Sequence, residues 1–245
     1  MNIVFAGTPQ FAADHLKLLV DSQHEVKCIL TQPDRGSGRG KKVIPSPVKE
    51  IGINNGIEIL QPYSLKDESI VRSLESLKPD LLLVVAYGLL IPKKVLDIAE
   101  KGSINVHASI LPRWRGAAPM EYSIYSGDNE SGISYMRMTE GIDEGPTLEI
   151  HKCKIEKGDD LGTLENKFIE LSKKNLLNFL EKFERGELKE TPQENSKATF
   201  APKIDSDFQK IDWNCLSNEI DQKIRSLNPK YGAFTFLGNK RIKIY

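Results

Sequence analysis

The sequence predicts a doubly wound α/β fold with a mostly parallel sheet and a short, incomplete α+β appendage at its C-terminal end. Short apolar runs alternate with amphipathic segments through the first two thirds of the chain. The run from Leu81 to Ala86 is apolar at every position, which is typical of a parallel strand covered on both faces. The turn Gly7-Thr8-Pro9 separates the first expected strand from the first expected helix.

The expected strands are short segments that are apolar or, as in 131–138, alternate in pattern, and several of the expected helices follow a turn or begin at a proline. The expected strands of the main domain are residues 3–6, 26–31, 57–60, 80–86, 103–107, 131–138 and 147–155. The expected helices are residues 10–20, 47–52, 67–77, 92–99 and 161–183. The segment after Gly186 is polar, and beyond it we expect a helix at 214–227 and a hairpin formed by 233–236 and 241–245. These elements divide the chain into a main domain at 1–186, a linker at 187–205 and the appendage at 206–245.

The composition of the chain limits the kinds of binding partner, metal site and cellular location that we expect. The chain has 245 residues with 34 basic and 34 acidic side chains, so any binding of nucleic acid must come from a local patch. Cys28, Cys153 and Cys215 lie far apart without CxxC spacing, and with four scattered histidines they form no zinc set. We therefore expect no metal. The longest apolar run is too short to span a bilayer and the first residues enter a strand directly, so we expect a cytoplasmic protein without membrane contact.

The segment INVHASILPRWRGAAP, beginning at Ile104, carries the strongest chemical signal. Side chains alternate along a strand, so Asn105 and His107 are expected on the same side, at the strand end where α/β folds bind ligands. An amide donor beside an imidazole suits a reaction in which a carbonyl gains negative charge while an amine loses a proton. A structural role remains the alternative for such a pair.

A carboxylate that could assist this pair lies in the loop GIDEGP, which contains Asp143. A carboxylate next to His107 would stabilise the protonated ring and fix its tautomer. The alternative interpretation of this acidic loop is a solvated turn.

A second signal is the cationic segment after the second expected strand. Arg35, Arg39, Lys41 and Lys42 alternate with Gly36, Gly38 and Gly40. A flexible loop of this composition can contact RNA phosphates and base edges, although a solvated loop is the simpler alternative.

These motifs resemble the folate-dependent formyltransferase family over essentially the whole chain. The matching segments are FAGTPQFAADHL, TQPDRGSGRGKKVIPSPVK, LLLVVAYGLLIP, INVHASILPRWRGAAP, GIDEGP, TFAPKI and IDW. GRGKK together with RWRGAAP is similar to the tRNA-directed branch. The resemblance implies a Rossmann-like domain, a 10-formyltetrahydrofolate donor and an initiator methionyl-tRNA acceptor. It places Asn105, His107 and Asp143 on the catalytic triad, and it makes the cationic segment a tRNA-contacting loop. It also places the folate-contacting loop on Ser109, Ile110, Leu111 and Pro112.

The sequence departs from the family pattern in ways that leave these side chains in place. Ala108 stands where the family commonly has Gly, and Glu144 stands where it commonly has Thr. The family also continues into a C-terminal β-barrel, so residues 206–245 are expected to be a remnant of a tRNA-binding domain, with weakened tRNA binding as the consequence.

We expect a monomer that formylates methionyl-tRNA. The alternatives are a formyltransferase acting on a small amine, such as an amino sugar or a purine-pathway amine, and a noncatalytic RNA-binding derivative.

Overall fold

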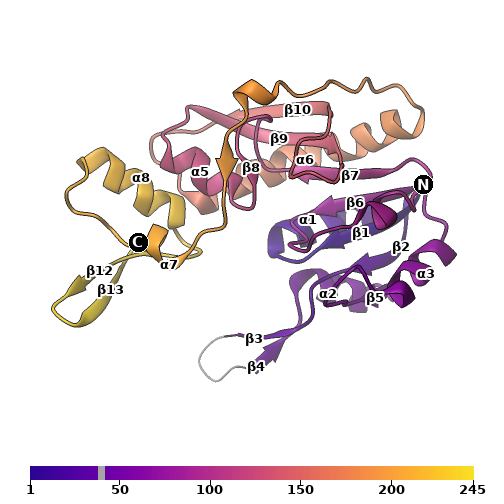
Figure 1. The fold of residues 1–245 in the computed structure, drawn as a ribbon, viewed down its shortest axis with the longest axis horizontal. Coiled ribbons are helices and arrows are strands. Elements are labelled where there is room, and N and C mark those ends of the chain that lie inside the picture. The colour runs from indigo at the N-terminus through magenta and orange to yellow at the C-terminus, as the bar shows by residue number, and fades with distance from the viewer. Residues whose placement is uncertain (38–41) are drawn as a thin grey trace. The chain divides into compact units, whose positions relative to one another are not determined.

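The computed structural model describes residues 1–37 and 42–245 and confirms the doubly wound α/β prediction (Figure 1). The main sheet is built from β1 (Asn2–Gly7), β2 (Glu25–Leu30), β5 (Glu58–Leu60), β6 (Leu81–Val85), β7 (Ser103–His107), β9 (Glu130–Arg137) and β10 (Thr147–Lys154). Its strand order is β10-β9-β7-β6-β1-β2-β5. The pairs β1–β2, β1–β6, β2–β5 and β6–β7 are parallel, as alternation of strands and helices requires.

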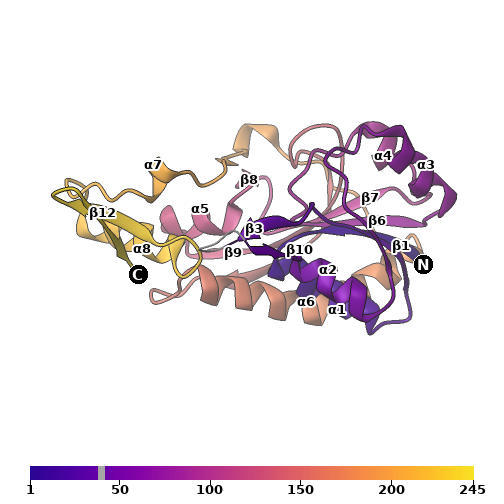
Figure 2. The same ribbon diagram turned by 90° about the horizontal axis from the view of Figure 1, so that it is seen from below.

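Helices lie on both faces of the N-terminal part of the sheet. Figure 2 shows α1 (Gln10–Val20) and α2 (Pro47–Asn54) on one side, and α3 (Glu68–Ser76) and α4 (Lys93–Leu96) on the other. Because strand side chains alternate between faces, Val4 of β1 and Leu82 of β6 share a cluster with Val71 of α3. All five residues of β6 are buried, which explains its unbroken apolar sequence.

The long helix α6 (Leu161–Glu184) begins at a reciprocal cap. The Asp160 carboxylate accepts from the Thr163 amide at 2.8 Å, and the Thr163 hydroxyl accepts from the Asp160 amide at 2.8 Å. These two bonds satisfy backbone donors that the first helical turn leaves without partners.

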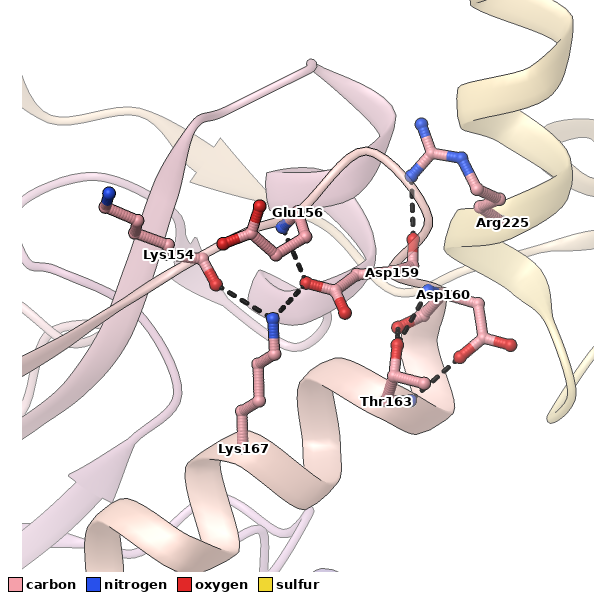
Figure 3. A network of polar contacts seen from close by, with 7 residues as sticks. All are labelled: Lys154, Glu156, Asp159, Asp160, Thr163, Lys167 and Arg225. Carbon is pink, nitrogen blue, oxygen red and sulfur yellow. Dashed lines mark hydrogen bonds and ion pairs between the residues drawn. The ribbon is translucent and has the colours of Figure 1, made fainter.

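The residue before that cap, Asp159, is the centre of the polar network in Figure 3. Its carboxylate accepts from Lys167 Nζ and from the Glu156 amide, while its backbone carbonyl accepts from Arg225 Nη1 at 2.7 Å. Burial acts to raise the pKa of Asp159, but the hydrogen bonds from Lys167 and Glu156 outweigh it and hold the pKa below its usual value. Arg225 belongs to α8 (Ser217–Leu227), so the network connects the start of α6 to the C-terminal region.

The chain forms two compact units. One comprises Met1–His107, Tyr135–Glu149 and Ser172–Pro192, and the other comprises Ala108–Ser134, Ile150–Leu171 and Gln193–Tyr245. In the second unit, α5 (Pro119–Tyr125), α7 (Ser206–Gln209), α8 and the hairpin of β12 (Ala233–Leu237) and β13 (Lys240–Ile244) accompany the short 3₁₀ helix Asn195–Lys197. A small core that includes Ala118, Ile211 and Leu227 packs α5 against the C-terminal elements.

Several elements differ from the sequence-based expectation. Two short strands, β3 (Arg35–Ser37) and β4 (Lys42–Ile44), pair antiparallel where a flexible loop was expected. Two more, β8 (Arg115–Gly116) and β11 (Phe200–Ala201), pair in parallel, and β11 lies in the expected linker. The last helix begins at Ser217 rather than 214, because Asp212 Oδ1 accepts from the Asn214 amide at 3.0 Å and holds that segment in a turn. The helix expected at 92–99 is helical only over Lys93–Leu96.

Candidate active site

The strand β7 carries the expected pair at its carboxyl end. β7 pairs with β6 so that Asn105 lies beside Val84, in the interior of the parallel sheet. Asn105 is half-buried and His107 is 5% exposed. Both side chains are therefore held by the sheet at the edge where ligands bind in this architecture.

The carboxylate of Asp143 joins the two side chains. Asp143 Oδ1 accepts from Asn105 Nδ2 at 3.1 Å, and Asp143 Oδ2 lies 3.5 Å from His107 Nδ1. A single carboxylate thus contacts both members of the pair, one through each of its oxygens. The sequence placed Asp143 next to His107 but did not predict its bond to Asn105.

The backbone around Asp143 is specialised for this contact. Asp143 has φ +48°, a left-handed conformation that Asp tolerates better than most residues because of its short polar side chain. Two residues later, a Cβ on Gly145 would lie 2.0 Å from the carbonyl oxygen of Arg137, so only glycine fits there. The loop closes tightly, and residues held in this way are common at active sites.

The contacts with Asp143 orient the amide of Asn105 and the imidazole of His107, which can play different chemical roles. The bond to Asp143 uses one of the two N–H donors of the Asn105 amide. The Nδ1 edge of the His107 ring faces Asp143, and the Nε2 atom lies on the opposite edge. The cluster can therefore present an oriented imidazole and an oriented amide to one reacting carbon.

The segment Ser109–Pro112 follows directly and is held from within and from a neighbouring strand. The Ser109 hydroxyl donates to the carbonyl of Arg113 at 2.6 Å, so this side chain stabilises its own turn. Ser134 of β9 contacts the backbone of both Ser109 and Leu111. Ser109 and Leu111 are buried, whereas Ile110 and Pro112 are partly exposed.

The arginines of the RWRG motif make intramolecular bonds. Arg113 forms two hydrogen bonds with the Asp128 carboxylate, at 2.8 and 2.6 Å, and Trp114 Nε1 donates to the same carboxylate. Arg115 is 4% exposed and donates to the side chains of Gln193 and Asn195. The motif therefore holds the expected linker in place, a structural role that the sequence did not reveal.

The cationic segment is only partly described. Arg35 is the first residue of β3 and Lys42 is the first residue of β4, while Arg39 and Lys41 lie outside the described residues. At the start of β3, Asp34 binds Lys49 Nζ at 2.5 Å and Gln61 Nε2 at 2.7 Å. These bonds, led by the one from Lys49, lower the pKa of Asp34 and fix the chain where it enters the strand.

Residues 1–37 and 42–245 offer neither a metal-binding cluster nor a membrane-spanning helix. None of the groups of His, Cys, Asp and Glu in these ranges is arranged to hold a metal ion. None of the helices in the same ranges combines the length and apolar character needed to cross a membrane.

Comparison with known proteins identifies the family. The formyl transferase family model matches residues 1–180, and the model of the formyl transferase C-terminal domain matches residues 203–245. The methionyl-tRNA formyltransferase of Marinobacter nauticus is 44% identical over 245 residues, which cover 100% of this chain and 79% of that protein. The chain belongs to the methionyl-tRNA formyltransferase family. Members from Coxiella burnetii and Legionella pneumophila are 45% and 44% identical over 245 residues, with 78% of each relative covered.

Solved structures of more distant proteins share the fold of this methionyl-tRNA formyltransferase family member. A sugar N-formyltransferase from Shewanella has a TM-score of 0.75 at 15% identity, covering 100% of this chain and 96% of that one. HypX from Aquifex aeolicus, in complex with tetrahydrofolic acid, has a TM-score of 0.67 at 19% identity, covering 96% of this chain and 35% of that one. At these identities the likeness concerns the fold alone.

Proposed function

We propose that this chain transfers the formyl group of 10-formyltetrahydrofolate to the α-amine of initiator methionyl-tRNA. The observation that carries the proposal is the single carboxylate of Asp143 contacting both Asn105 and His107 at the end of β7. Identity of 44% to a methionyl-tRNA formyltransferase over the whole chain supports the choice of acceptor. A sugar N-formyltransferase of the same fold has been solved with 5-N-formyl-THF, which supports a folate donor.

In the proposed reaction the methionyl amine attacks the formyl carbon, and a new C–N bond forms as the carbonyl becomes an oxyanion. Asn105 donates a hydrogen bond to that oxygen, and one such donor typically contributes about 3 kcal/mol of transition-state stabilisation. His107 takes the proton that the amine loses. The bond to N10 of the folate then breaks, and the proton ends on that nitrogen. The products are formylmethionyl-tRNA and tetrahydrofolate.

Asp143 is assigned an orienting role in this scheme. Its negative charge, 3.5 Å from His107 Nδ1, stabilises the imidazolium that forms when the amine is deprotonated. Its bond to Asn105 fixes the amide so that it donates in the required direction. No nucleophilic side chain is needed, because the substrate amine attacks directly.

We assign folate contact to Ser109, Ile110, Leu111 and Pro112, and tRNA contact to Arg35, Arg39, Lys41 and Lys42. The folate segment follows His107 directly in the chain, which supports the first assignment. The cationic segment follows β2, which is also a parallel strand of the sheet, and this supports the second. If each cationic residue neutralises a phosphate, its replacement by Ala reduces the slope of log affinity against log salt by about 0.7–0.9.

We further propose a monomeric enzyme that works in the cytoplasm, where its tRNA substrate is found. Its proposed domains are a catalytic domain at 1–186, a linker at 187–205 and the remnant of a C-terminal tRNA-binding domain at 206–245. The two family models, which match residues 1–180 and 203–245, support these boundaries. Light scattering of the purified chain at several concentrations tests the monomer.

The test of the function is a competition between acceptors. The protein is incubated with donor carrying a labelled formyl group, together with equal concentrations of methionyl-tRNA and a nucleotide-linked amino sugar. We expect label in the tRNA fraction, released as formylmethionine on mild hydrolysis. Label in the amino sugar alone would support the small-amine alternative. Binding of tRNA without transfer of label would support a noncatalytic RNA-binding protein.

A further inference from the structure

Ser134 makes an unusual pair of bonds for a side chain in the middle of a buried strand. It lies in β9 and is 0% exposed. Its hydroxyl donates to the carbonyl oxygen of Ser109 at 2.6 Å and accepts from the amide of Leu111 at 3.1 Å. One side chain therefore satisfies both a donor and an acceptor on the backbone of the segment that follows His107.

Contact with water does not explain the polar side chain at this position, because Ser134 and its neighbours in the strand are buried. Ile133 and Tyr135, on either side of Ser134, are both 0% exposed. A buried hydroxyl without partners is unfavourable in such surroundings, so the two bonds to the loop explain the serine. Ser, Thr and Tyr hydroxyls donate and accept through one atom, and serine is the smallest of the three.

The two bonds fix the loop on a rigid support. Backbone N–H and C=O groups that are buried and unpaired are costly, so the turn at Ser109–Leu111 depends on an external partner for these two groups. The Ser109 hydroxyl closes the same turn by donating to the carbonyl of Arg113. The strand β9 belongs to the main sheet, and hydrogen-bonded core strands generally open less readily than loops.

We propose that Ser134 is a positioning residue for the formyl donor, acting through the backbone of Ser109 and Leu111. The inference rests on the proposed function, which assigns folate contact to this segment. A flat heterocycle is held largely by backbone groups and apolar walls, so the path of the backbone determines how well it binds. Ser134 itself is too deeply buried to contact a substrate.

The first test uses Ser134→Ala, which removes the hydroxyl at nearly constant volume. We expect the KM for 10-formyltetrahydrofolate and the Kd for the unreactive isomer 5-formyltetrahydrofolate to rise about tenfold, as loss of one buried hydrogen-bonding group predicts. The KM for methionyl-tRNA should stay within twofold of the wild-type value. A general structural defect would not separate the two substrates in this way.

The matched control is Ser131→Ala, in the same strand. Ser131 is 2% exposed, and its hydroxyl lies 3.1 Å from the Ser123 hydroxyl of α5 rather than on the Ser109–Pro112 segment. This variant should bind 5-formyltetrahydrofolate as the wild type does. An equal loss of folate affinity in both variants would overturn the proposal.

A second pair of variants keeps the test decisive if Ser134→Ala does not fold. Ser134→Thr retains the hydroxyl, and Ser134→Val replaces it by a side chain with the shape of Thr but no hydroxyl. The difference in folate affinity between these two variants therefore reports the hydrogen bonds alone. The Ser134→Thr variant should bind 5-formyltetrahydrofolate about tenfold more tightly than the Ser134→Val variant, and equal affinity of the two variants would overturn the proposal. Wild-type protein that binds no folate would instead contradict the proposed function, so the two failures are distinguishable.

Discussion

Acid should destabilise this protein through one buried histidine, His15 of α1. Its Nδ1 lies 2.7 Å from the carbonyl oxygen of Phe11, and its Nε2 lies 2.6 Å from the hydroxyl of Ser172 in α6. Burial lowers the pKa of His15 to about 4, despite the opposing effects of the Phe11 carbonyl and the nearby Asp14 carboxylate. The native protein therefore contains a neutral imidazole that the unfolded chain protonates more readily.

The size and sign of the effect follow from the two pKa values. The unfolded chain protonates this ring near 6.5 and the folded protein near 4, and the difference corresponds to about 3 kcal/mol. Because the folded pKa is the lower one, the unfolded state binds more protons between these values. His15 therefore contributes full stability above pH 6.5, and this contribution is lost as the pH falls through 4.

The assay is urea denaturation of the wild type and His15→Gln at several pH values between 7 and 4. As the pH decreases from 7 to 4, the free energy of unfolding should fall by about 3 kcal/mol more for the wild type than for His15→Gln. As a control, Ser172→Ala removes a partner of the ring but keeps the titrating group, so it should retain the wild-type slope. Parallel curves for the wild type and His15→Gln would refute the reasoning.

Substitutions at three further contacts give additional tests. Asp143→Asn should lower kcat for formyl transfer about 100-fold or more, with both KM values little changed, because the imidazolium loses its counter-charge; an unchanged kcat in steady-state assays would contradict this. Asp128→Ala should lower the free energy of unfolding by about 2 kcal/mol, since it leaves the buried Trp114 indole N–H without its acceptor, and urea denaturation followed by fluorescence measures it. Lys167→Met should lower the free energy of unfolding, measured by chemical denaturation, by about 3 kcal/mol. The substitution leaves the carboxylate of Asp159, which is 7% exposed, without its cationic partner. Adding Asp159→Asn should recover part of that loss, and no recovery would argue against the pairing.

The fold could be predicted well where local signals and burial agree. The helix at Gln10–Val20 and the strand at Ser103–His107 have the expected bounds, because Pro9 fixes the start of the first and the buried, β-branched Ile104 and Val106 favour the second. The strands β3 and β4 were not expected, since alternating glycines mask their pattern. The pairing of β8 with β11 was also hidden, because it joins segments that lie far apart in the sequence.

In the candidate site, too, features set by neighbouring residues in the sequence could be predicted, whereas contacts between distant segments could not. Alternation along a strand placed Asn105 and His107 on one side, and the acidic loop supplied Asp143 as a partner. That both oxygens of Asp143 are engaged depends on a left-handed backbone and a glycine two residues later, which the sequence alone did not indicate. The part played by Ser134 was invisible for the same reason, because its contacts are to backbone atoms of a distant segment.

The proposed transfer of a formyl group to methionyl-tRNA depends on Asn105, His107 and Asp143 acting together. Its most direct test is the single-turnover rate of transfer of labelled formyl by the wild type and by His107→Ala, with both substrates saturating. We predict rapid transfer by the wild type and a rate at least about 100-fold lower for the variant, consistent with loss of general base catalysis. A His107→Ala protein that transfers the label at the wild-type rate would contradict the account.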